Sequence, residues 1–306
     1  MIGYILKRMF LAIPIIFGVT LIAFLILYLT PGDPVDVILG DRATPEAQAE
    51  MRERLGLDQP IPVQYGRWLA NVLRGDFGNS LISKQPVANS IAERLPYTLK
   101  LTVVALLLSI VIGIPVGVVT AVKQNSLVDH IGMSAALFFY STPIFWLGLM
   151  LMLTFSINLR WLPVSGAYEW KSLILPALTL GLPRVGSLAR MMRAETLEVL
   201  REEYVITART KGLSEWIVIF KHVLRNAATP VLVLLFLALP WLIGGAVVIE
   251  TIFAWPGMGQ LMYQAILQKD FPVIQALLMI LALLTVGFNL LGDVVTGLLD
   301  PRIRVR

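Results

Sequence analysis

The chain has 306 residues, of which 57% are hydrophobic and only 15% are charged, and its mean hydropathy is +0.77. Because an ordinary soluble domain carries about 25% charged residues, this composition excludes a soluble domain and indicates a membrane protein. The chain contains no cysteine, which excludes disulfides and thiolate metal sites. Its formal net charge of +5 is compatible with nucleic-acid binding or with membrane topology, and the positions of the basic residues decide between them.

Six apolar windows suit membrane-spanning helices, since a bilayer core about 30 Å thick is crossed by roughly 20 helical residues. The first window follows the basic pair Lys7 and Arg8, as in a secretory signal. We expect it to be a retained span, because it exceeds the roughly 7–15 residues of a signal's apolar region and no small-residue cleavage site follows it. The predicted fold class is all-α, a polytopic membrane protein with six transmembrane helices. The windows cover residues 9–29, 99–122, 131–157, 172–192, 229–249 and 273–298.

The loop between the first two windows, residues 30–98, contains residues that start and stop helices. Thr44 predicts an N-cap followed by proline and an acidic first turn, and Gly56 predicts the end of that helix. A second helix is predicted in "VQYGRWLANVLRG" and a third over residues 86–94. Two interpretations of this external loop stay open: a small cap packed on the outer ends of the spans, or a docking surface for an external partner.

With six spans both termini lie on the same side of the membrane, and the Lys and Arg residues of short loops indicate which side is cytoplasmic. One set of short segments is rich in basic residues, whereas the other carries only Arg160, Lys171 and Lys269. We therefore expect both termini to be cytoplasmic, together with the segment Glu203–Asn226, and we expect no nucleic-acid partner. The basic residues of the cytoplasmic set are Lys7, Arg8, Lys123, Arg190, Arg193, Arg201, Arg209, Lys211, Lys221, Arg225, Arg302, Arg304 and Arg306.

Sequence motifs for catalysis are absent. The chain has no Gly-x-x-x-x-Gly-Lys-Ser/Thr phosphate loop, no His-Glu-x-x-His and no Gly-x-Ser-x-Gly, so we expect neither a catalytic residue nor a metal site. Active transport must then draw on an ion gradient or on a separate ATPase. Ion-coupled carriers usually need ionisable groups near the midplane. Glu250 and Asp293 lie near the ends of their windows, where we expect them to reach water, so an ion-driven carrier or channel is the weaker alternative.

The fourth window combines two prolines with several small residues, a composition suited to helix contacts or to the wall of a cavity. Within it, Arg184 lies about a dozen residues from the start, so its side chain either extends toward the cytoplasmic surface or faces a polar pathway. Each of these residues, taken singly, is also compatible with ordinary helix packing. The candidates for lining a pathway are Arg184 and Ser187 of this window, together with Ser141 and Thr142 of the third window.

The segment Glu203–Asn226 predicts two helices joined by a turn. Acidic residues gather toward the start of the first helix and Arg209 and Lys211 toward its end, which complements the helix dipole. Gly212 suits a left-handed C-terminal cap, and Ser214 can cap a second helix that begins at the next residue. That helix carries an apolar surface that must be covered by the membrane, by its own bundle or by a groove in another protein. The surface consists of Trp216, Ile217, Ile219, Phe220 and Val223.

The string "ITARTKG" in this segment resembles the EAA-x-x-x-G signature of permease subunits of binding-protein-dependent ABC importers. Ala208 and Gly212 stand in register with that signature. The downstream Ile-x-Leu-Pro of the family falls on residues 222–225, where Leu224 matches and His222 departs from the general pattern.

Six further strings, in chain order, resemble the oligopeptide, dipeptide and nickel permeases. They are "LTPGDP", "LGLDQP", "GDFGNS", "WLPVSG", "ETIFAWPGMGQL" and "LLDPRIR". The resemblance covers nearly the whole chain and implies a multi-pass protein of the bacterial cell membrane with the ABC type-1 transmembrane domain. It implies an N-terminal helix and external loop (residues 1–95), a five-helix transmembrane domain (96–299) containing a coupling loop (193–228), and a cytoplasmic tail (300–306).

The resemblance also implies a function and partners. The chain would be the permease subunit of an ATP-driven importer of short peptides, with a nickel-chelate permease as the alternative. Its partners would be a second, usually different, permease subunit, two cytoplasmic ATPase subunits that bind ATP and Mg, an external solute-binding protein and the lipid bilayer. The residues implied in coupling to the ATPase are Ala208, Gly212, Leu213, Ser214, Trp216, Ile217, Phe220, His222 and Leu224.

Overall fold

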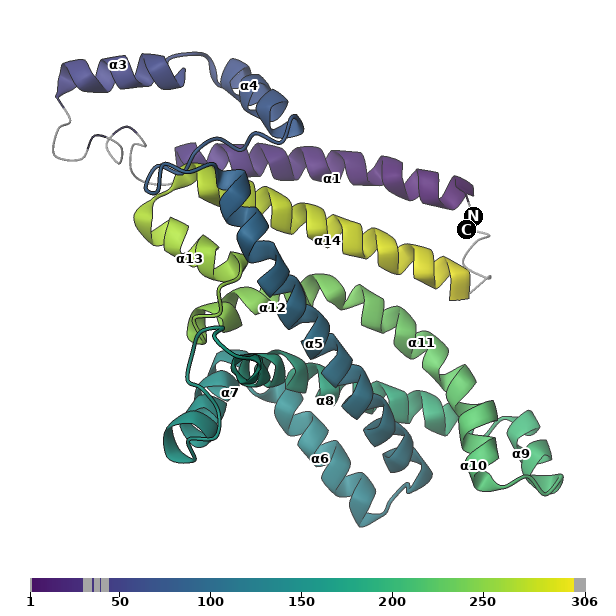
Figure 1. Cartoon of the computed structure of the whole chain (residues 1–306). Helices are drawn as coiled ribbons and strands as arrows, with labels where there is room; N and C mark the ends of the chain where they lie inside the picture. The colour runs from purple at the N-terminus through teal and green to yellow at the C-terminus, as the bar shows by residue number, and fades with distance from the viewer. Residues whose placement is uncertain (1, 30–34, 36–38, 40–43, 300–306) are drawn as a thin grey trace. The chain divides into compact units, whose positions relative to one another are not determined.

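A computed structural model describes residues 2–29, 35, 39 and 44–299, and nearly all of these are helical (Figure 1). The described residues form no strand, so the predicted all-α class is confirmed. The predicted tail 300–306 and most of the strings "LTPGDP" and "LLDPRIR" lie outside the described residues. The helices are α1 (Ile2–Leu29), α3 (Pro45–Leu55), α4 (Ile61–Leu73), α5 (Val87–Val122), α6 (Leu127–Ser141), α7 (Ile144–Leu151), the π-helix η2 (Met152–Asn158), the 3-10 helix η3 (Trp170–Leu173), α8 (Ile174–Val199), α9 (Glu203–Thr210), α10 (Glu215–Ile217), the π-helix η4 (Val218–Val223), α11 (Leu224–Leu237), α12 (Leu239–Ile252), α13 (Met258–Gln268) and α14 (Phe271–Leu299).

Five helical segments among the described residues are long and apolar enough to cross a membrane, and the bent pair of α6 with α7 and η2 makes six if it counts as one span. The predicted six transmembrane helices are the upper end of this count of five to six. Two boundaries differ from the predicted windows. The external helix predicted over residues 86–94 is continuous with the second span in α5, and the fifth window is divided at Ala238 between α11 and α12.

The third window is interrupted by a bend of 108° between α6 and α7. Thr142 lies between the two helices in an extended conformation, with φ −76° and ψ 129°, because the residue before a proline is disfavoured in the helical region. Its hydroxyl donates a hydrogen bond of 2.6 Å to the carbonyl oxygen of Phe138. Pro143 is the N-cap of α7, so the window is broken at this point and is not one straight helix.

The chain divides into two compact units. One comprises the described residues of Leu99–Trp255 and Phe288–Arg306, and the other those of Ile2–Thr98 and Pro256–Gly287. Residues 256–287 thus join the N-terminal part of the chain, and α5 contributes to both units. The predicted division near residue 95 follows the family resemblance and stays a prediction.

In the N-terminal unit the loop that follows the first span, predicted to be external, contains folded helices. The hydroxyl of Thr44 caps α3 by accepting a hydrogen bond from the backbone N–H of Ala47, and Gly56 adopts φ +68° at the other end, as predicted. Trp68 of α4 lies 5.8 Å, between ring centroids, from Phe24 of α1. At least α4 therefore packs on the first span, as the cap interpretation expects. Docking of an external partner is untested.

The other unit is built from helices that approach one another very closely. A Cβ placed on Gly186 of α8 would lie 2.2 Å from the carbonyl oxygen of Ala136 in α6, and one on Gly117 of α5 would lie 2.6 Å from that of Ala189 in α8. Real side chains do not tolerate such distances, so both positions require glycine for helix packing. The sequence left two explanations for the small residues of the fourth window, helix contacts or a cavity wall, and for Gly186 the explanation is helix contact.

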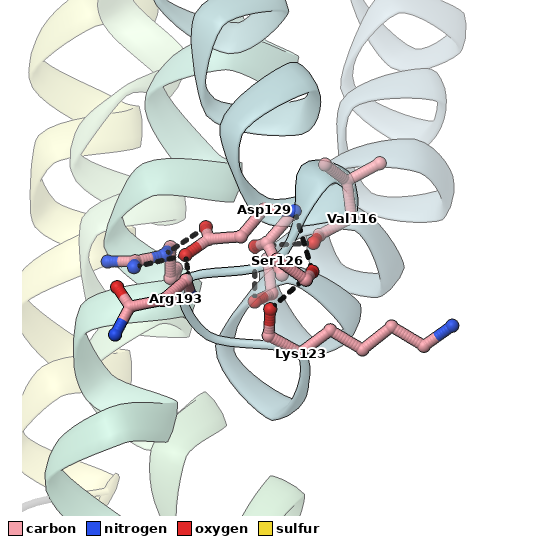
Figure 2. A network of polar contacts seen from close by, with 8 residues as sticks. Val116, Lys123, Ser126, Asp129 and Arg193 are labelled. Carbon is pink, nitrogen blue, oxygen red and sulfur yellow. Dashed lines mark hydrogen bonds and ion pairs between the residues drawn. The ribbon is translucent and has the colours of Figure 1, made fainter.

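An ion pair ties α6 to the far end of α8 in the same unit. Both Nε and Nη2 of Arg193 lie 2.7 Å from the carboxylate oxygens of Asp129, which is almost fully buried (Figure 2). The same carboxylate accepts a hydrogen bond of 3.0 Å from the backbone N–H of Asn125, and Ser126 caps α6. Two-point Arg–carboxylate pairing is directional, so it fixes the last turns of α8 relative to α6.

The expectation that Glu250 reaches water is wrong. We expected its carboxyl group to reach water at the end of the fifth window, but it is 0% exposed. The chain turns back after α12, and the backbone N–H of Trp255 donates a 2.8 Å hydrogen bond to the carbonyl oxygen of Glu250. Phe253 and Trp255 are themselves buried in the main apolar cluster, so the end of α12 is covered by its own continuation.

Candidate functional site

The segment between α8 and α11 forms an elbow, which we define as residues 200–223. Figure 1 shows α9 and α10 at the opposite end of α8 from α7. Gly212 has φ +77°, its N–H donates to the carbonyl of Arg209 at 2.9 Å, and the N–H of Leu213 donates to that of Ala208 at 3.4 Å. This paired arrangement is a Schellman cap, so the left-handed glycine is confirmed. The second helix begins at Glu215 as predicted, although the hydroxyl of Ser214 makes no capping hydrogen bond.

A small buried cluster holds the two limbs of the elbow together. Val205 and Ala208 of α9 pack against Val218 and Val223 of η4. Because these four side chains are at most 6% exposed, the first limb cannot swing without uncovering apolar surface. Arg209 of α9 also forms an exposed ion pair with Glu215 of α10, with Nε 2.8 Å from Oε1. Exposed pairs add little stability, so this contact mainly restricts the orientation of α9 relative to α10.

The structure divides the predicted coupling residues into two groups. Ala208 is 6% exposed and faces its own chain, so its small side chain allows α9 to approach η4 and does not offer a contact to a partner. His222 and Leu224 are only partly exposed. The other predicted residues lie on the surface. These are Gly212, Leu213, Ser214, Trp216, Ile217 and Phe220.

Two exposed residues of α9 were missed by the sequence analysis. Ile206 is 54% exposed, and Tyr204 is also exposed while its hydroxyl accepts a 2.8 Å hydrogen bond from Nδ2 of Asn226. The sequence contained a signal for this exposure. Val205 and Ala208 are three residues apart and share one face of the helix, whereas Ile206 lies on a different face. Ala208 was the only residue of α9 among the predicted coupling residues, and the others follow Thr210.

The apolar surface of the second limb is covered only in part. Val223 is buried in the elbow cluster, and Ile219 packs against α8 and α11. The rings of Trp216 and Phe220 lie 4.0 Å apart and line a groove of about 230 Å³ against the end of α5. Trp216 nevertheless stays 69% exposed. The helices of the same chain therefore cover one side of the apolar surface of the second limb and leave the other side open.

Arg184 and Ser187, two of the four pathway candidates, line one cavity of about 390 Å³ between α5, α8, α11 and α12. The guanidinium of Arg184 lies over the indole ring of Trp241, with Cζ 4.2 Å from the ring centroid. Ser141 and Thr142 do not line this cavity; they lie at the bend between α6 and α7. The structure thus brings together one pair of the candidates and separates the other.

A bundle of membrane-spanning helices with a rigid elbow at one end and a charged cavity within defines a polytopic transport subunit. The chain belongs to the family of the binding-protein-dependent transport system inner membrane component, whose model matches residues 113–305. The model of the N-terminal part of such membrane components matches residues 1–102. The protein is accordingly a permease subunit of a type I ABC importer and a multi-pass protein of the bacterial inner membrane, as the sequence resemblance implied.

The chain is similar over its full length to curated proteins. The chain is 42% identical over 306 residues to the glutathione transport system permease protein GsiC of Salmonella paratyphi A, covering 100% of both chains. It is 45% identical over 312 residues to a putative peptide transport system permease protein of Brucella abortus, covering 99% of both. Among solved structures, the inward-facing MetNI methionine ABC transporter matches with a TM-score of 0.60 and 21% identity, over 69% of this chain and 96% of that one. An amino acid ABC transporter matches with a TM-score of 0.56 and 15% identity, over 68% and 93%. These two structures support the fold.

Proposed function

We propose that this permease translocates short peptides, which an external solute-binding protein delivers, and that ATP hydrolysis in two separate cytoplasmic subunits drives the transport. Relatives named for glutathione and peptide transport, matched from end to end, support the peptide substrate. The absence of a phosphate loop from the sequence supports a separate ATPase. A second permease subunit would complete the wall of the pathway.

The observation that carries the coupling role is the exposed apolar face of the elbow. Ile206 of the first limb, Leu213 of the turn and Trp216 of the second limb are all exposed apolar residues. A capped helix that presents such residues suits a groove in another protein. The excess of Lys and Arg on this side of the membrane supports a cytoplasmic position for the elbow and for both termini.

The internal contacts of the elbow explain how force would reach the spans. A displacement of α9 would be transmitted to η4 and α11 through the buried contact of Val205 and Ala208 with Val218 and Val223. It would also act on the end of α8, which Arg193 ties to Asp129. Since α8 and α11 both line the cavity of Arg184, closure of the ATPase pair would change the shape of that cavity.

Site-specific cross-linking tests this docking. The chain has no cysteine, so single variants Ile206→Cys and Leu213→Cys carry one thiol each. In the assembled transporter we expect both to form products with the ATPase subunit through a thiol-to-amine reagent, and we expect MgATP to change the yield. Val205→Cys is the matched control, because its side chain on the same helix is fully buried. Failure of both surface variants to cross-link, or equal yield from the control, would contradict the docking.

A further inference from the structure

The cavity around Arg184 lies deep in the membrane-spanning part of its unit. Arg184 is the eleventh residue of the 26-residue helix α8, which places it about 15 Å along the axis from Ile174. A cation at such depth is costly unless something compensates its charge. Arg184 is therefore a position at which a functional role is expected.

Nothing in the lining of the cavity neutralises this cation. The polar side chains of the lining belong to Ser109, Arg184 and Ser187, and the remaining lining residues are apolar, so no acidic side chain is among them. The hydroxyl of Ser109 already donates a 2.7 Å hydrogen bond to the carbonyl oxygen of Leu106. Within the described part of the chain, Nε of Arg184 is buried and has no hydrogen-bond partner.

The indole ring of Trp241 fixes how Arg184 presents itself. The guanidinium lies over this ring, with Cζ 4.2 Å from the ring centroid, and because this cation–π contact uses no lone pair, the N–H donors can still bind another partner. A guanidinium fork held in one plane matches the two oxygens of a carboxylate. The apolar wall beside it suits the hydrocarbon part of a small solute, and the volume of about 390 Å³ lies within the range of about 300–1,000 Å³ found for ligand sites.

We propose that this cavity is a substrate subsite in which Arg184 binds the carboxylate of the peptide, with Trp241 as its positioning residue. The inference rests on the proposed peptide transport and adds the group that is recognised. Short peptides of different sequence share their backbone and their terminal charges, so a carboxylate contact would anchor many of them without reading their side chains. The charge of Arg184 selects the carboxyl end over the amino end.

Direct binding to the assembled transporter in lipid nanodiscs, without the solute-binding protein, tests the subsite. The probes are dialanine and its C-terminal amide, which differ only in the carboxylate. We expect the wild type to bind the free acid about tenfold more tightly than the amide, since one charge-assisted contact accounts for a factor of that size. Arg184→Met should remove this preference. Arg184→Lys, which keeps the charge and loses the fork, should retain only part of it.

A neighbouring arginine supplies the control. Arg190 lies on the same helix with its Cζ 4.1 Å from the centroid of the Tyr140 ring. Its Nε is also buried and has no hydrogen-bond partner among the described residues, but Arg190 does not line the cavity. Arg190→Met should keep the preference for the free acid. Equal binding of acid and amide by the wild type, an unchanged preference in both Arg184 variants, or the same loss in Arg190→Met would overturn the subsite.

The failure of this subsite can be distinguished from failure of the proposed function. If the reconstituted wild type imports dialanine with ATP and the Arg184 variants bind like the wild type, only the subsite is wrong. If the wild type imports no peptide at all, the proposed function is wrong. Elution of each variant complex at the wild-type volume in size exclusion shows that altered binding does not arise from misassembly.

Discussion

Replacing Gly212 with proline is expected to abolish ATP-driven uptake while the chain still inserts and assembles with its partners. The residue has φ +77°, whereas proline is fixed near −65°, and proline also removes the N–H that donates to the carbonyl of Arg209. A misplaced proline costs about 3 kcal/mol, which corresponds to a fall of about a hundredfold in the population of the intact elbow. The measurement is peptide uptake compared with ATP hydrolysis in the same proteoliposomes, where we expect hydrolysis to continue without uptake.

The control for this variant is Gly212→Asn. Asparagine tolerates the left-handed conformation, and a Cβ at this position meets no atom of the described residues within 4 Å. The elbow should therefore keep its shape and the transporter most of its uptake. Wild-type uptake by the proline variant would contradict the role of the elbow in coupling. Equal loss in both variants would show that the glycine matters for something other than its backbone conformation.

Gly186→Ala is expected to lower the stability of the permease itself. The added methyl group would lie 2.2 Å from the carbonyl oxygen of Ala136, so α6 and α8 would have to separate. Overpacking of this kind typically costs about 1–3 kcal/mol, and here it acts on backbone that cannot move aside as a side chain can. The measurement is the thermal unfolding temperature of the purified complex, together with the amount of protein in the membrane.

Gly244→Ala is the matched control for that substitution. It makes the same change in α12, where a Cβ meets no atom of the described part of the chain within 4 Å. The higher helix propensity of alanine should therefore leave the stability unchanged or raise it by up to about 1 kcal/mol. An unfolding temperature of Gly186→Ala equal to that of this control would refute the close α6–α8 contact.

The spans and caps of this protein could be predicted from local sequence, and the physical reason is the same in both cases. Hydropathy over about 20 residues is a property of one segment, and so is the cap formed by Thr44 at the start of α3. The bend at Thr142 had a local signal in the proline that follows it. The bend was missed because the hydropathy of the residues on both sides is high enough to predict one continuous span.

Contacts between distant segments could not be predicted in this way. The pairing of Asp129 with Arg193 joins residues 64 positions apart, and the cation–π contact of Arg184 with Trp241 depends on how α8 and α12 pack. The burial of Glu250 likewise follows from the path of the chain after α12. A charge at the end of a window therefore does not by itself indicate access to water.

The elbow shows where a motif is informative and where it is not. Its glycine determines a backbone conformation, which the sequence predicts directly, and Gly212 adopts it. Its apolar residues are equally suited to a contact within the chain or to one with a partner. Only the packing of Ala208 against η4 and the exposure of Ile206 separate the two uses.

ATP-driven peptide import is tested most directly by uptake into proteoliposomes. The chain would be reconstituted with its partner permease, the two ATPase subunits and the solute-binding protein, and accumulation of labelled dialanine would be followed with and without MgATP. We expect accumulation that requires MgATP and the solute-binding protein, and no uptake by the chain alone under a proton or sodium gradient. Gradient-driven uptake by the chain alone, without any ATPase, would contradict the proposed function and support a secondary carrier.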